Sequence, residues 1–149
     1  MKHLLTALFL IMFGLAVPAA AQAQTADDLV GLWSYTVPVP GGKEVGQSRF
    51  SADGQMLQDS RVTMTIGQFD LDARYKATGT WVLRGDTLTM TITGVEGEPI
   101  RIQNHQIPLE DIVPIGESID ATLTWQDRNT IDYGTMGFDG RMQRVQEAP

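Results

Sequence analysis

Hydrophobic and polar residues alternate with a period of two along most of the chain after residue 31. The pattern is clearest in residues 74–84, where Tyr75, Ala77 and Trp81 alternate mainly with threonines and basic residues. A period of two is typical of β-strands, and strict alternation indicates strands with one buried and one solvated face. We therefore predict an all-β domain of eight or nine short antiparallel strands. The other alternating segments are residues 32–37, 45–51, 55–66, 87–93 and 119–125.

Turn residues separate these segments. Residues 51–54 (Ser-Ala-Asp-Gly) predict a hairpin turn in which Gly54 supplies the positive φ, and residues 84–86 predict a second tight turn. Residues 67–72 are expected to be the connection between the third and fourth strands. Short helical turns are expected just before Gly31 and within residues 109–113. Many short strands joined by tight turns are typical of an up-and-down barrel or a sandwich.

The predicted inner face carries most of the bulky apolar side chains, whereas the outer face is rich in threonine. An eight-stranded barrel is either filled by such side chains or holds one small ligand. Aromatic rings and flexible methionines suit an apolar ligand site. The candidate ligand-binding residues of the barrel interior are Tyr35, Phe50, Met64, Tyr75, Met90, Trp125 and Tyr133.

Residues 94–116 form the one irregular stretch of the pattern. Ile100 and Ile102 predict a sixth strand there, and prolines 108 and 114 bracket the expected helical turn. Long irregular segments in compact domains are often functional. We expect this segment to cover or flank one mouth of the barrel.

The N-terminal residues are typical of an export signal. Residues 4–17 form an apolar run without charge, and Ala21-Gln22-Ala23 provides a cleavage site flanked by small residues. The run is shorter than the roughly 20 apolar residues of a membrane span, which favours a cleaved signal peptide over an uncleaved anchor. Cleavage after Ala23 leaves residues 24–149 as one domain, expected in the periplasm or secreted to the medium. The chain has no cysteine for lipid attachment.

The charge balance narrows the possible partners. The chain has a formal net charge of −7, and loss of the signal segment removes Lys2 alone among the charged residues, giving −8. An acidic chain without a cluster of Lys or Arg is unsuited to nucleic acid or to an anionic membrane surface. The lack of cysteine also excludes disulfides, thiol catalysis and cysteine metal sites.

Several short motifs follow one another in a defined order along the chain. Gly31-x-Trp33 opens the first strand after the helical turn, and residues 50–54, 79–88 and 141–145 follow. Together they resemble the bacterial secreted lipocalin-like domains, a family of small calycin-type barrels, over residues 26–145. The resemblance implies a single eight-stranded up-and-down barrel whose floor is closed by Trp33, with a basic residue of the last strand across it. Alternation favours Arg144 for this role over Arg141, with a cation–π contact worth about 1 kcal/mol or more.

His105 is the only histidine after the signal segment. Several carboxylates lie within a few residues of it, so it is a candidate general base or metal ligand as well as a solvated loop histidine. The loop histidine is favoured because zinc needs further nitrogen or sulfur ligands, and nothing else in the sequence supports haem.

Other catalytic arrangements are poorly supported. Ser60 and Ser118 lack a nucleophile motif and a second histidine partner. The pair Asp70 and Asp72 has too few ligands for a calcium loop, and a charged hairpin turn is the expected alternative. Parity places Glu117 and Asp120 on opposite faces, which disfavours glycoside chemistry. We therefore predict no enzyme activity, no cofactor and no metal.

Two functional classes remain open. In the first, the barrel binds a small apolar or amphipathic molecule in its interior. In the second, a filled barrel is a protein-interaction scaffold, such as an inhibitor of an exported enzyme. The first is favoured because the interior is rich in aromatic and methionine side chains, whereas the turns offer mainly Gly, Asp and Pro. An open cavity would favour the ligand, and a filled interior with an exposed apolar patch would favour the protein partner.

Overall fold

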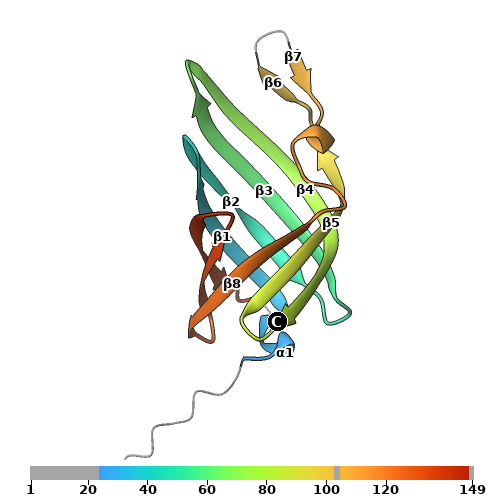
Figure 1. The fold of residues 1–149 in the computed structure, drawn as a ribbon, viewed down its shortest axis with the longest axis vertical. Helices are drawn as coiled ribbons and strands as arrows, with labels where there is room; N and C mark the ends of the chain where they lie inside the picture. The colour runs from blue at the N-terminus through green and yellow to red at the C-terminus, as the bar shows by residue number, and fades with distance from the viewer. Residues whose placement is uncertain (1–23, 103–104, 148–149) are drawn as a thin grey trace, which may run out of the picture.

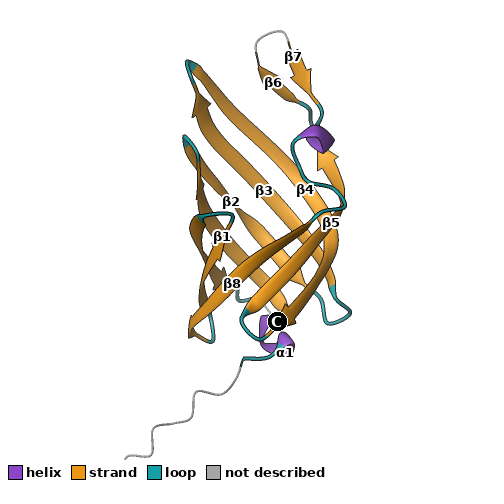
Figure 2. Ribbon diagram, viewed as in Figure 1, coloured by secondary structure: helices purple, strands orange, loops and turns teal. Residues whose placement is uncertain are grey.

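The chain folds as a closed eight-stranded antiparallel barrel, which confirms the predicted fold class. The computed structural model describes residues 24–102 and 105–147; the expected signal peptide, residues 1–23, lies outside them. Figure 1 and Figure 2 show the barrel with the short helix α1 at one end and the β6–β7 hairpin at the other. The elements are α1 Ala26–Leu29, β1 Gly31–Val39, β2 Gly42–Phe50, β3 Gln55–Ile66, β4 Phe69–Arg84, β5 Thr87–Gly97, β6 Ile100–Ile102, β7 His105–Ile107, η1 Leu109–Asp111, β8 Ser118–Asp127, β9 Thr130–Thr135 and β10 Phe138–Arg144.

The barrel is an up-and-down meander. Its strand order is β1-β10-β9-β8-β5-β4-β3-β2, so consecutive strands are neighbours and β1 closes the ring against β10. The predicted strand at Ile100 and Ile102 is present as β6, but it pairs only with β7 and forms a separate two-stranded sheet. The segment between β5 and β8 therefore leaves the barrel wall and returns to it.

The barrel wall splits between β5 and β8. These strands pair only over Thr87–Thr91 and Ser118–Thr122, whereas β5 runs on to Gly97 beside β4. Beyond that pairing a single parallel bridge, Ile92 with Ile115, joins the two sides in the described chain. The end of the barrel farther from α1 is therefore wider than the end beside it.

One expected loop is instead part of a long hairpin. Residues 69–72 belong to β4, and the turn between β3 and β4 consists of Gly67 and Gln68 alone. The outer face explains the extension, since Arg61 forms a bidentate ion pair with Asp72, and Thr65 donates a hydrogen bond of 2.8 Å to Asp70. Cross-strand pairs of this kind stabilise antiparallel register. The two aspartates are thus parts of a charged hairpin, as the sequence analysis favoured.

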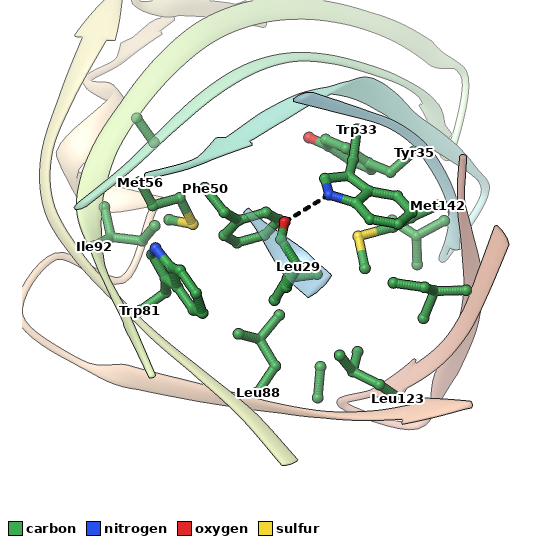
Figure 3. Close-up of a cluster of buried hydrophobic side chains, with 14 of the residues drawn as sticks. Leu29, Trp33, Tyr35, Phe50, Met56, Trp81, Leu88, Ile92, Leu123 and Met142 are labelled. Carbon is green, nitrogen blue, oxygen red and sulfur yellow. Dashed lines mark hydrogen bonds between the residues drawn. The ribbon is translucent and has the colours of Figure 1, made fainter. Parts of the chain in front are cut away.

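The end of the barrel beside α1 is closed by a packed floor. The Trp33 ring is fully buried, and its Nε1 donates a hydrogen bond of 2.8 Å to the Leu29 carbonyl of α1 (Figure 3). The Arg144 guanidinium lies 4.3 Å from the centroid of the Trp33 ring, as the alternation of the last strand predicts. Arg144 also donates hydrogen bonds to the carbonyls of Val30 and Asp28, which fixes α1 across the barrel end.

Two aromatic pairs belong to this packed floor. Phe50 meets Trp81 edge to face with a centroid separation of 5.5 Å, and Trp33 meets Trp125 in the same way at 5.8 Å. Figure 3 shows Leu88, Leu123 and Met142 completing this cluster. Burial of each large apolar side chain contributes about 1.5–3 kcal/mol, so the closed end carries much of the stability of the fold.

Candidate functional site

The wide half of the barrel contains an apolar cavity of about 480 Å³. Residues of β6, β7 and η1 contribute to its wall. Figure 1 shows the β6–β7 hairpin at the end of the barrel away from α1, so the cavity lies at that end. At its rim Ile66 and Ile112 are each 50% exposed and Met136 is 76% exposed. Aliphatic side chains dominate the wall, among them Val37, Val39, Val62, Leu71, Ile92, Ile102, Ile107 and Ile119.

Five of the seven candidate ligand residues line this cavity: Tyr35, Met64, Tyr75, Met90 and Tyr133.

Phe50 and Trp125 do not line it. Both side chains point inward, as predicted, but they lie in the packed floor on Trp81 and Trp33. Phe50 borders only a void of about 60 Å³ below the main cavity. Alternation gives the face of a residue but not its depth along the barrel axis. Phe50 pairs with Gly31 at the start of β1, so it lies at the end of the barrel beside α1.

A row of hydroxyl groups crosses the sheet at the base of the cavity. Tyr35 on β1 pairs with Gly46 on β2, Gly46 with Ser60 on β3, and Ser60 with Tyr75 on β4. Gly46 leaves room for the phenol, because a Cβ at this position would lie 2.8 Å from the Tyr35 hydroxyl oxygen. Ser60 is buried and lies 2.5 Å from the same oxygen. The register therefore gathers three hydroxyl groups from three strands.

Glu44 precedes Gly46 by two residues in β2 and lines the cavity beside this row. Its Oε1 accepts hydrogen bonds from the Tyr35 hydroxyl at 2.7 Å and from the Tyr75 hydroxyl at 2.8 Å. The Gln58 amide Nε2 lies within hydrogen-bond distance of three oxygens: that of Tyr35 at 2.6 Å, that of Ser60 at 3.0 Å and Oε1 of Glu44 at 3.2 Å. We call Tyr35, Glu44, Gln58, Ser60 and Tyr75 the polar cluster.

The tyrosines of the site are neutral donors at ordinary pH. Burial is the main cause that raises the pKa of Tyr35 far above its usual value, and the negative charge of Glu44 raises it further. The same two causes, in the same order, raise the pKa of Tyr75 and that of Tyr133. Phenols that keep their protons can donate to a carboxylate, which is the arrangement seen in the polar cluster.

The cavity has a one-sided charge. Glu44 is the only ionisable acid among the described residues that line it, and those residues include no Lys, Arg or His. The neighbouring basic residues Lys43 and Arg61 lie on the opposite face of their strands and are exposed. A half-buried carboxylate therefore stands at the base of an apolar cavity without a basic partner in the described wall.

The irregular segment flanks the mouth of the cavity. Ile100 and Leu109 are buried against Ala73 of β4 and form a small second core. Gly97 lets Leu109 approach, because a Cβ there would lie 2.8 Å from the leucine Cδ1. Ile112 stands at the rim. This is the flanking position that the sequence analysis expected for residues 94–116.

The remaining candidates lie apart from the cavity. His105 is exposed at the start of β7, and Ser118, Glu117 and Asp120 are exposed around the start of β8. In residues 24–102 and 105–147, no group of three or more acidic or histidine side chains is placed to hold a metal ion. No helix in these ranges is long and apolar enough to cross a membrane.

The sequence motifs do not single out Glu44 or Gln58, and they offer Ser60 only as a candidate nucleophile. A signal for them existed in the parity of two strands. Counting back by twos from the inward Phe50 gives Glu44, and the inward Val62 gives Ser60 and Gln58. Polar side chains in a strand normally indicate its solvated face. The alternation of inward and outward positions is therefore the one sequence signal that places these residues inside the barrel.

Neither family models nor curated proteins assign a role to this site. No family model and no curated protein matches the sequence of the chain. An eight-stranded barrel hosts many unrelated roles, so the fold alone does not define an activity. A function for the chain has to be inferred from the cavity and the polar cluster.

Proposed function

We propose that this chain is a binding protein for a small apolar or amphipathic molecule held in the wide half of the barrel. The supporting observation is a cavity of about 480 Å³ with an aliphatic wall and one polar cluster at its base. Ligand sites typically enclose about 300–1,000 Å³ and combine apolar walls with a few fixed polar groups. The apolar part of the ligand would contact the aliphatic wall, and a polar end would reach Glu44 and the tyrosines.

The motifs around Trp33 and Arg144 support placing the chain among the secreted lipocalin-like barrels. The apolar run and the Ala21-Gln22-Ala23 site support export to the periplasm or medium with a cleaved signal peptide. Mass spectrometry of the protein from its own source tests the export proposal. A chain that begins near Gln24 is expected, and an intact Met1 would contradict cleavage.

The alternative, a protein-interaction scaffold, draws on the exposed rim residues Ile66, Ile112 and Met136. That reading expected a filled interior, and the open half of the barrel favours the ligand instead. Rim residues of this kind also suit a passage for an apolar molecule. We therefore rank the binding function first.

A blocked cavity provides the direct test of ligand binding. Met64→Trp places a large ring among the lining residues, and Thr80→Trp adds the same ring on the exposed outer face of β4. A neutral dye such as N-phenylnaphthylamine should bind saturably to the native chain and to Thr80→Trp but not to Met64→Trp. Equal binding by the two variants would place the dye elsewhere. Native mass spectrometry followed by extraction would then identify any molecule that copurifies.

A further inference from the structure

We propose that the ligand carries a cationic head group, for which Glu44 is the counter-charge, on an apolar body. This inference rests on the proposed binding function and adds the charge of the ligand to it. It follows from the chemistry of the polar cluster and of the cavity wall.

The hydrogen bonds of Glu44 leave one carboxylate oxygen for a ligand. Tyr35, Tyr75 and Gln58 all donate to Oε1, and no described residue donates to Oε2. Glu44 itself lines the cavity. The three donors hold the carboxylate in place without neutralising it, because all three are uncharged. A fixed carboxylate with a free oxygen is an acceptor for the N–H groups of an ammonium or a guanidinium.

The wall of the cavity favours a cation over an anion. Glu44 is the one carboxylate among the described lining residues, and that lining offers no basic residue to balance its negative charge. A bound carboxylate or phosphate would face that charge at short range in surroundings of low polarity, where Coulomb interactions are strong. A bound ammonium would remove the imbalance.

The aromatic residues of the site add to this preference. Tyr35, Tyr75 and Tyr133 are all of the tyrosines in the chain, and all three line the cavity. Aromatic rings attract ammonium groups, including alkylated ones. The aliphatic wall suits a hydrocarbon chain or ring. The ligand class is therefore a primary or alkylated amine with an apolar body.

Three decyl compounds separate charge from hydrophobicity. Decylammonium, decanol and decanoate share one chain and differ in the charge of the head group, and each would be competed against N-phenylnaphthylamine at neutral pH below its micelle concentration. We expect decylammonium to displace the dye at a concentration about tenfold or more below that needed for decanoate, with decanol between them. This ranking uses the native chain alone and does not depend on the folding of a variant.

Two variants assign the ranking to Glu44. Glu44→Gln keeps the size of the side chain and an acceptor oxygen but removes the charge. Glu98→Gln removes one exposed charge that does not line the cavity. We expect Glu44→Gln to lower decylammonium affinity about tenfold, to raise decanoate affinity and to change decanol affinity by less than about twofold. Glu98→Gln should keep the native ranking, and Glu44→Asp should recover part of the preference for the amine.

The outcomes separate this inference from the proposed function. Saturable binding of all three compounds with equal affinity, or with decanoate preferred, would overturn the cationic ligand and leave the binding function in place. An unchanged ranking in Glu44→Gln would likewise overturn the role of Glu44. If none of the compounds displaces the dye and the dye itself does not bind saturably, the binding function fails as well.

Discussion

Raising the pH above 10, the usual pKa of a phenol, acts directly on the tyrosines of the candidate site. The chain has three tyrosines, and all of them line the cavity. Burial and the nearby charge of Glu44 raise the pKa of each one well above its ordinary value. The folded chain therefore keeps phenol protons that the unfolded chain loses near pH 10. The contribution of these tyrosines to the free energy of unfolding is therefore fully present below that pH and is lost as the pH rises.

The size of this effect follows from the number of protons that the folded state retains. Tyr35 and Tyr75 lie in the polar cluster, and Tyr133 is less buried than either. Two to three retained protons make the free energy of unfolding fall by about 3–4 kcal/mol for each pH unit above 10. A domain of ordinary stability has about 5–15 kcal/mol to lose. The barrel should therefore unfold within a few pH units, and the tyrosines should ionise together as it does.

Phenolate absorbance and far-UV circular dichroism, recorded on the same samples across the alkaline range, test this reasoning. We expect one steep rise in phenolate absorbance that coincides with loss of the β signal. The chain unfolded in urea is the control, and its tyrosines should ionise near pH 10 over an ordinary broad curve. Ionisation of two or more of the three tyrosines near pH 10 while the circular dichroism stays native would include Tyr35 or Tyr75 and would refute the buried polar cluster.

Further predictions concern the floor and the packing of the barrel. Arg144→Met should lower the free energy of unfolding by about 2–4 kcal/mol in urea titrations, because the ring contact with Trp33 and three hydrogen bonds to carbonyl groups are lost; an unchanged urea midpoint would contradict this closure. Leu29→Ala leaves a hole in the floor and should cost about 2–5 kcal/mol in the same assay. Gly140→Ala places a Cβ 2.4 Å from the ring of Tyr133 and should cost about 1–3 kcal/mol while weakening dye binding; native dye affinity would show that the ring has room to move.

The strands and their inner faces could be predicted because each has a strong local signal. The bounds of β3 match the predicted residues 55–66 at both ends, since Gly54 and Gly67 supply the left-handed turns on either side. The inward positions of β4 were readable because Tyr75 and Trp81 alternate with polar residues without interruption. Local turn chemistry and a period of two therefore suffice for a meander of this kind.

The depth of each residue in the barrel could not be read from that pattern. Phe50 and Tyr35 have the same inward parity, yet one lies in the floor and the other lines the cavity. Strand register and the split between β5 and β8 decide this difference, and both arise from pairing between distant segments. Glu44 was hidden for a related reason, because an isolated charge in a strand normally indicates its solvated face.

Both ends of the described chain lie at the closed floor, so a group attached to either end would be opposite the mouth of the cavity. The described chain starts beside α1, and its last strand ends at the same end of the barrel, with the Val145 amide bonded to the Leu32 carbonyl (Figure 1). The rim residues Ile66 and Met136 lie at the opposite end. A surface anchor or a fluorescent fusion joined after residue 147 would therefore leave the mouth facing solution. Immobilisation through this end of the chain would therefore keep the cavity open to the proposed amine ligand.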